Sequence, residues 1–271
     1  MKKLLALLLL TAMCLLVLAG CGDGTPQGGD AGVQAGTGDL AYVKEKGTLV
    51  VGVTEFEPMD YQDADGNWTG FDADMAVAFA ESLGVSAEFR VIEWDSKIKE
   101  LEDKTIDVVW NGMTLNDEVK ASMETSKPYF NNAQMVIVRA ENASRYKITE
   151  SIAGASFVVE SGSAGQEQAD ANGFTYTEVA DQAAALQQVS SGAADAAIID
   201  FLMAKSMIGL GTDYADLTYT VGLSSEEYVV GFRKGSDLAA ALNEFFAASY
   251  ADGSMQTVAR NYGINAFLLA Q

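Results

Sequence analysis

The chain has 271 residues, with 17 Lys and Arg, 38 Asp and Glu, no histidine and two cysteines, and its formal net charge is −21. Such an acidic chain lacks the basic surface that nucleic-acid binding requires, so we expect no nucleic-acid partner. The lack of histidine removes the commonest general base and the usual ligand of zinc and copper sites. The length suits one large or two modest domains, and 49% apolar residues are enough to fill their cores.

The first twenty residues have the pattern of a lipoprotein signal peptide. Two lysines precede an apolar run, Leu4 to Leu18, that is too short for a permanent membrane helix. The run ends in Leu-Ala-Gly followed by Cys21, which resembles the lipobox of bacterial lipoproteins. The resemblance implies cleavage before Cys21 and lipidation of its sulfur. The alternative is an ordinary secretory signal in which Cys21 has no role.

Processing at this site would leave the mature protein without a thiol, because Cys14 leaves with the signal peptide. We therefore expect no disulfide, no metal site with a cysteine ligand and no cysteine nucleophile. Removal of Lys2 and Lys3 takes the net charge from −21 to −23. Residues 21–39 are rich in Gly, Asp and Gln and have no apolar periodicity, which is typical of a flexible tether. The expected location is the extracytoplasmic face of the cell membrane, held there by the lipid.

The body opens with strands and helices in alternation. Residues 48–53, 89–92 and 106–110 are strand-like, and 96–103 is helical. Asp65-Gly66 predicts a tight turn within 61–68. Asp72 is the predicted N-cap of a helix that ends at Gly84. This order predicts an α/β domain with a mainly parallel sheet.

A second α/β unit is predicted from about residue 142. The end of the chain adds one strand and two helices, which are too few for a third domain, so we expect them to pack on the first unit. A ligand cleft is expected between the two units, at the carboxyl ends of the strands. The predicted strands of the later part are 156–159, 174–179, 196–199 and 228–232, and its helices are 166–172, 181–190, 238–250 and 255–262.

Several polar or aromatic residues follow predicted strands. Phe56 follows the first strand and Trp94 the second, and each suits either the core or an apolar wall of a ligand site. The segment from Asn111 through Gly112 to Thr114 leaves its strand abruptly, offering an amide, a carbonyl and a hydroxyl. Asp200 ends another strand, as a helix N-cap, a ligand group or both.

Two motifs of metal or catalytic sites are incomplete. Residues 61–72 approach a calcium loop, but Tyr61 occupies the first ligand position and Asp72 the twelfth, so a hairpin and a helix cap explain them better. The turn 161–165 lies between a strand and a helix but lacks the nucleophile-elbow frame, and no histidine gives Ser163 a base. Its backbone N–H groups suit an anion such as a carboxylate.

Taken in order, these strand-end segments resemble the polar amino-acid solute-binding proteins of ABC importers, solute-binding protein family 3. The resemblance covers about residues 40–268. It is carried by Gly70-Phe71-Asp72, by Ile106-Asp107 with Asn111 to Thr114, by Ser126 to Tyr129, by Ser161 to Gly165 and by Ala193 to Asp200.

The resemblance implies a type II periplasmic-binding-protein fold, an α/β clamshell whose lobes are joined by a hinge of two crossing strands. Lobe 1 would comprise residues 40–138 with 228–271, and lobe 2 residues 139–227. The ligand would close the lobes, and the permease would recognise the closed form. It also implies a monomeric carrier rather than an enzyme, without a cofactor, that works with ABC permease subunits.

The resemblance further assigns roles to strand-end residues. Trp94 would cover the ligand side chain, and Phe56 lies near an expected aromatic, although one residue is missing before Pro58. The Gly112 carbonyl, Thr114 and Asp200 would accept hydrogen bonds from the α-ammonium. In the second lobe, Ser163 and the backbone N–H groups of Ala164 and Gly165 would hold the α-carboxylate.

One departure from the family concerns the main carboxylate clamp. In the family an arginine follows Thr-x-x-x-Glu, whereas here Val119 follows, and Lys120 would point elsewhere on a helix. Loss of a charge-assisted pair of this kind costs roughly 1.5–3 kcal/mol. Asn111 and the second-lobe N–H groups are candidate substitutes. We hypothesise that the ligand keeps an amine but is not a standard free α-amino acid, and that Val119→Arg improves amino-acid binding.

Two rival functions share this fold. A sensory lipoprotein would lack neighbouring genes for permease and ATPase subunits. A dehydratase-like enzyme, as in cyclohexadienyl dehydratase relatives, would use acidic groups in the cleft and would turn its ligand over, whereas a carrier returns it unchanged.

Overall fold

The computed structural model describes residues 38–271. The predicted signal peptide, the lipidation of Cys21 and tether residues 21–37 lie outside the described residues. The tether was expected to reach residue 39, but helix α1 begins at Asp39, whose carboxylate pairs with Arg233 Nε at 2.9 Å. Within the described part, no helix combines the length and apolar character needed to cross a bilayer.

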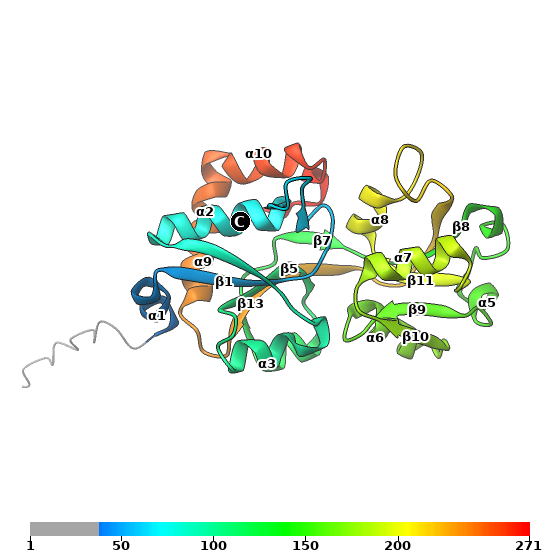
Figure 1. Ribbon diagram of the computed structural model, residues 1–271, viewed down its shortest axis with the longest axis horizontal. Helices are drawn as coiled ribbons and strands as arrows, with labels where there is room; N and C mark the ends of the chain where they lie inside the picture. The colour runs from blue at the N-terminus through cyan, green and yellow to red at the C-terminus, as the bar shows by residue number, and fades with distance from the viewer. Residues whose placement is uncertain (1–37) are drawn as a thin grey trace, which may run out of the picture. The chain divides into compact units, whose positions relative to one another are not determined.

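The first sheet has the order β4-β1-β5-β13-β6, and β7 also pairs with β13. Strands β1, β4 and β5 are parallel, and β13 runs antiparallel to β5, so the end of the chain returns to the first lobe as predicted. Figure 1 shows β13 crossing beside β5. The strands are β1 (Thr48–Val53), β4 (Ser86–Val91), β5 (Val108–Thr114), β6 (Met123–Thr125), β7 (Phe130–Asn132) and β13 (Glu226–Arg233).

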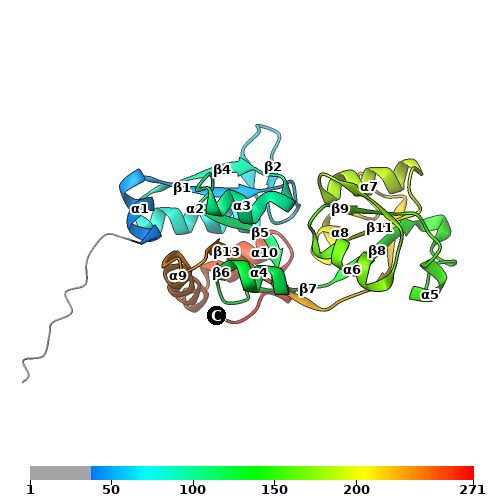
Figure 2. The ribbon, with the colours of Figure 1, turned by 90° about the horizontal axis from the view of Figure 1, so that it is seen from below.

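Both faces of this sheet are covered by helices. In β1, Leu49, Val51 and Val53 lie in the larger core cluster, whereas Val50 lies in a cluster on the other side, as the alternation of side chains along a strand requires. Helices α2, α9 and α10 contact one another, and α3 contacts β5 and β13 (Figure 2). The helices of this lobe are α1 (Asp39–Lys46), α2 (Phe71–Leu83), α3 (Lys97–Glu102), α4 (Asp117–Ser122), α9 (Leu238–Asp252) and α10 (Ser254–Asn261), with short 3₁₀ turns η1 (Trp94–Ser96) and η3 (Asn265–Phe267).

The second sheet has the order β10-β9-β11-β8-β12, in which β9, β10 and β11 are parallel and β8 is antiparallel to both of its neighbours. Its apolar residues divide between two core clusters, one shared with α6 and the other with α7 and α8. The elements are β8 (Gln134–Arg139), β9 (Phe157–Glu160), β10 (Tyr176–Val179), β11 (Ala196–Asp200) and β12 (Leu217–Gly222), with α5 (Thr149–Ile152), α6 (Ala164–Asn172), α7 (Gln182–Ser191), α8 (Phe201–Met207) and η2 (Ala140–Asn142).

Two chain segments connect the sheets, one between β7 and β8 and one between β12 and β13. Because β8 begins at Gln134 and pairs with β11 and β12, the first lobe ends near residue 133 and not at 138, and the second begins there and not near 142. The lone apolar strand Gln134–Arg139 has no neighbouring helix in sequence to mark it as part of the second unit.

Local structure differs from the prediction at two further places. The N-cap of α2 is Gly70 and not Asp72, whose buried carboxylate instead accepts hydrogen bonds from the Gly112 N–H and the Tyr129 hydroxyl. Strand β5 continues to Thr114, because β13 pairs with it there. The predicted turn at Asp65-Gly66 is present between β2 (Tyr61–Gln62) and β3 (Trp68–Thr69).

Candidate functional site

A cavity is lined by residues of both lobes. With the space that is open to solvent included, it measures about 400 Å³. Eight of the nine ligand contacts expected from the sequence line it, and Gly165 does not. The lining residues are Thr54, Phe56, Trp94, Lys97, Asn111, Gly112, Met113, Thr114, Asn116, Val119, Glu160, Gly162, Ser163, Ala164, Gln182 and Asp200.

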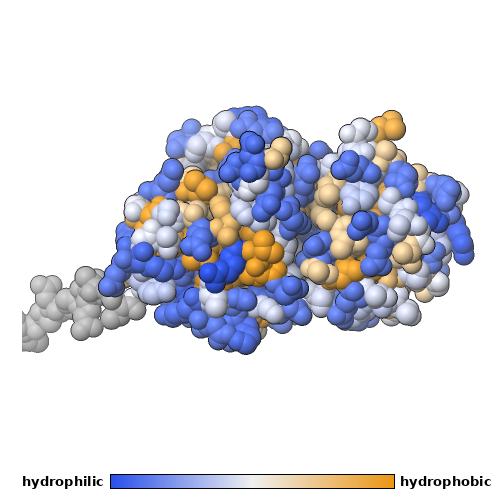
Figure 3. All heavy atoms as spheres, in the orientation of Figure 1, coloured by the Kyte–Doolittle hydropathy of each residue, from blue (hydrophilic) through white to orange (hydrophobic). Residues whose placement is uncertain are grey.

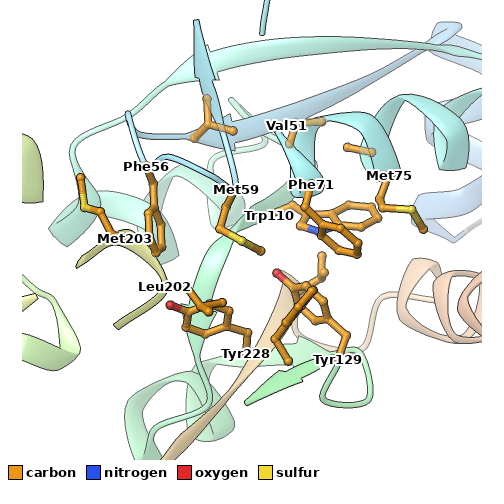
Figure 4. Packing of buried hydrophobic residues seen from close by; sticks show 14 of the residues in the cluster. Val51, Phe56, Met59, Phe71, Met75, Trp110, Tyr129, Leu202, Met203 and Tyr228 are labelled. Carbon is orange, nitrogen blue, oxygen red and sulfur yellow. The ribbon is translucent and has the colours of Figure 1, made fainter. Parts of the chain in front are cut away.

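Gly112 brings the first-lobe backbone into this cavity from within β5. Its φ of +54° is a left-handed conformation that glycine adopts without strain. A Cβ at this position would lie 2.4 Å from Cε1 of Phe56, so the ring packs directly on the glycine. The Phe56 ring also meets Tyr228 edge-on at 6.2 Å. Figure 4 shows both rings in the apolar cluster that includes Leu202 and Met203 of the second lobe.

The Asn111 amide is used entirely inside the protein. Its Oδ1 accepts from the N–H and the hydroxyl of Thr54, and its Nδ2 donates to the Thr54 carbonyl at 3.0 Å and to Asp60 Oδ2 at 2.8 Å. Both amide hydrogens are therefore occupied. The expectation that Asn111 replaces the missing arginine as a donor to a carboxylate is wrong, because the buried Asp60 takes that hydrogen bond.

Asp200 is buried at the end of β11 and is not a side-chain cap of α8. Its carboxylate accepts from Asn132 Nδ2, from the Tyr228 hydroxyl and from Gln182 Nε2. Burial, together with the charge of Glu226, raises the pKa of Asp200 to about 7.

Sequence reasoning missed Glu160, a second buried acid beside Asp200. It is 3% exposed, it lines the cavity, and its Oε1 has no hydrogen-bond partner among residues 38–271. Burial, followed by the charge of Asp200, raises the pKa of Glu160 to about 8. Glu160 ends the parallel strand β9 next to β11, so the rule that ligands lie at the carboxyl ends of strands would have identified it.

A third carboxylate, Glu226, lies outside the cavity lining and connects elements of the two lobes. Its Oε1 accepts from the Thr114 hydroxyl at 2.8 Å, from Asn132 Nδ2 at 2.7 Å and from Gln134 Nε2 at 2.8 Å. The hydroxyl hydrogen of Thr114 is therefore donated inside the protein, and its oxygen can still accept a hydrogen bond from a ligand. None of Asp200, Glu160 and Glu226 forms an ion pair with a Lys or Arg in the described chain.

The second-lobe turn before α6 forms the opposite wall. Ser163 is the N-cap of α6, and its hydroxyl oxygen accepts from Gln166 N at 3.1 Å. Ser163 and Ala164 line the cavity, whereas Gly165 packs against β11: a Cβ there would lie 2.7 Å from the Ile198 carbonyl oxygen. The glycine at 165 is thus explained by close helix–strand packing rather than by a place in the lining.

Trp94 and Lys97 line the cavity from the segment after β4. Trp94 is buried in η1, and the Lys97 ammonium lies 5.0 Å from the centre of its ring. Val119 also lines the cavity and is 1% exposed, packed in the same apolar cluster as Trp94. Lys97 escaped sequence reasoning because a lysine in the first turn of a helix is ordinarily a solvated residue.

No cluster that would suit a metal ion is present in residues 38–271: no three Asp, Glu, Cys or His side chains are grouped for it. The carboxylate of Asp63, part of the incomplete calcium motif, accepts from the N–H groups of Asp65 and Asn67 at 2.9 Å each and so stabilises the hairpin turn. What the cavity offers chemically is a set of buried acceptors, two aromatic walls, one buried ammonium and the start of a helix.

Comparison with known proteins finds relatives that match most of this chain. The L-cystine-binding protein TcyJ of Escherichia coli (strain K12) is 31% identical over 232 residues, 84% of this chain and 87% of the relative. Cyclohexadienyl dehydratase of Pseudomonas aeruginosa is 28% identical over 180 residues, 65% of this chain and 67% of the relative.

Among solved structures, an ABC uptake transporter substrate-binding protein from Streptococcus pneumoniae with bound histidine superposes with a TM-score of 0.76 at 27% identity, covering 83% of this chain and 96% of that chain. Such neighbours have the type II fold expected from the sequence. Residues 49–265 match the family model of the bacterial extracellular solute-binding proteins, family 3. The chain therefore belongs to the bacterial extracellular solute-binding proteins of family 3.

Proposed function

We propose that the protein captures a small amino-acid-like, ammonium-bearing ligand between its two lobes and delivers it to an ABC importer. The observation that carries this proposal is the pair of buried acids Asp200 and Glu160 in a cavity lined by both lobes, without a bonded cation in the described chain. Burial disfavours the charged forms of these two acids, and an ammonium beside them would favour those forms, so the site favours a cationic ligand.

In this proposal the ligand ammonium donates to Asp200, to the Gly112 carbonyl and to the Thr114 oxygen. The rings of Phe56 and Trp94 form the apolar walls that exclude water from those contacts. Relatives that bind L-cystine or histidine support a ligand of amino-acid size.

Substitution Asp200→Asn is expected to weaken binding of the preferred amine-bearing ligand by about 10–100-fold, because a charge-assisted hydrogen bond is worth roughly 1.5–3 kcal/mol. Calorimetry after a thermal-shift screen of amino acids, cystine and their decarboxylated amines measures it. The matched control is Asp213→Asn, an exposed acid of the same lobe, which should bind like the unmodified protein. Equal affinities of the two variants would contradict the role of Asp200.

We propose further that the protein is held at the extracytoplasmic face of the membrane by lipid on Cys21. Substitution Cys21→Ala should abolish metabolic labelling with a fatty acid and release the protein from the membrane fraction. The variant lacks the sulfur that would carry the lipid, and the lipid is the proposed anchor. Labelling that persists in Cys21→Ala would contradict lipidation at this residue.

A second candidate is a lyase of the dehydratase kind. Glu160, with a pKa of about 8, holds a proton at neutral pH and lies in the cavity, as a general acid must, and one relative is a dehydratase. Mass spectrometry of the ligand recovered after prolonged incubation separates the two functions. A carrier returns the ligand unchanged, whereas a dehydratase returns it less one water.

A further inference from the structure

Lys97 places a buried ammonium in the wall of the cavity. The side chain is 3% exposed, although its helix α3 begins at this residue on the rim of the first lobe. Its Nζ donates to the Trp94 carbonyl at 3.2 Å and, across to the second lobe, to the Gly162 carbonyl at 3.1 Å. The ammonium is thus held where the two lobes meet.

The hydrogen bonds of this ammonium go to neutral carbonyls. Within residues 38–271 its one ion pair is with Glu118 Oε2 at 4.0 Å, and that glutamate side chain is 55% exposed. Burial lowers the pKa of Lys97, while the charges of Glu118, Glu160, Glu167 and Asp95 act in the opposite direction. Its counter-charge is a carboxylate 4.0 Å away on a half-exposed side chain, which compensates a buried ammonium only weakly, so an anion entering the cavity would be stabilised there.

The start of α6 adds to the same wall. Lys97 contacts Gly162 directly, and Ser163 and Ala164 follow in the lining. Helix α6 has nine residues, and its first N–H groups and the positive end of its dipole favour an anion. Val119, in the place of the family arginine, contributes only apolar surface to this cavity.

We propose that the Lys97 ammonium, together with the start of α6, binds a carboxylate of the ligand. Lys97 would thus do the work of the family arginine, whose position Val119 occupies in this chain. The inference rests on the proposed capture of an amino-acid-like ligand and narrows it to ligands that keep a free carboxylate. It reverses the hypothesis, drawn from Val119 and Asp200, that the ligand is not a standard free α-amino acid. Lys97 is then the residue that separates amino acids from the corresponding amines.

The test pairs each amino acid with its decarboxylated amine: L-arginine with agmatine, L-histidine with histamine, and L-cystine with cystamine. Calorimetry is done with the unmodified protein, with Lys97→Met and with Lys99→Met, the control, whose exposed lysine lies on the same helix. For the pair that binds, Lys97→Met should lose about 10–100-fold in affinity for the amino acid and less than about 3-fold for the amine. Lys99→Met should change neither.

A double variant that moves the positive charge to another position distinguishes loss of a ligand contact from a structural defect. Lys97→Leu with Val119→Arg moves the cation to the family position and should recover most of the amino-acid affinity that Lys97→Leu alone loses. Melting of each ligand-free variant shows whether it is folded.

The outcomes separate this inference from the proposed function. If Lys97→Met binds the amino acid as tightly as the unmodified protein does, or loses amino acid and amine equally, the inference is overturned and capture of an amine-bearing ligand stands. If none of the six compounds binds the unmodified protein, the proposed function fails and the inference fails with it.

Discussion

Raising the pH from about 4.5 to 8 should lower the free energy of unfolding of the ligand-free protein, with Glu160 alone contributing on the order of 4 kcal/mol. Its pKa is raised from 4.5 to about 8 by burial and by the charge of Asp200. The folded state therefore keeps a proton that the unfolded chain has released. This contribution is complete below the unfolded pKa and is lost as the pH rises through the folded pKa.

Urea unfolding at several pH values between 4.5 and 8 measures the slope of the free energy of unfolding against pH. Glu160→Gln keeps the shape of the side chain without the titration, so its free energy of unfolding should fall less steeply with pH. The slope should not vanish, because burial also raises the pKa of Asp72 and of Asp200 to about 7 each. Glu150→Gln, an exposed control, should keep the original slope. An unchanged slope in Glu160→Gln would show that this acid does not hold its proton in the fold.

The same acids should couple ligand binding to protons. An ammonium placed beside Asp200 and Glu160 favours their charged forms, so its binding should release protons near neutral pH. Calorimetry in buffers of different ionisation enthalpy measures that release directly, and a proton count that stays at zero between pH 6 and 8 would argue against an ammonium at this position.

The parts of the fold that follow from local pattern were predictable from the sequence. Strand β1, the hairpin turn at Asp65-Gly66 and the end of α2 at Gly84 each depend on residues close in sequence. The lobe boundary was misplaced because β8 joins the second sheet through pairing with β11 and β12, which are distant in sequence. Nothing local distinguishes that strand from one of the first sheet.

The candidate site likewise contains residues that were predictable from the sequence and residues that were not. Residues at strand ends, such as Trp94 and Asp200, were found because one rule places ligands there. What the sequence did not show is how buried polar groups pair with one another: the Asp72 carboxylate serves Gly112 and not its own helix. Lys97 was missed for the same reason, since its burial comes from the second-lobe segment that covers it.

Asn111→Leu should lower the free energy of unfolding by about 3–5 kcal/mol, because it leaves several buried polar groups without partners at roughly 1–3 kcal/mol each, not fully additive. The groups are the N–H, carbonyl and hydroxyl of Thr54 and Oδ2 of Asp60. Asp60 is fully buried and its other oxygen, Oδ1, already lacks a partner among the described residues. Leucine restores the volume of the side chain but none of these hydrogen bonds.

The control for this loss of stability is Asn172→Leu. The Asn172 amide donates to the Gln168 carbonyl on the exposed side of α6. Its removal should change the free energy of unfolding by less than about 0.5 kcal/mol. Ligand affinity of folded Asn111→Leu, measured below its melting transition, should stay within about 3-fold, because both amide hydrogens were already committed to Thr54 and Asp60. A variant that keeps its stability but loses its ligand would instead make Asn111 a direct contact, and the donor that the family arginine supplies would then be sought there rather than at Lys97.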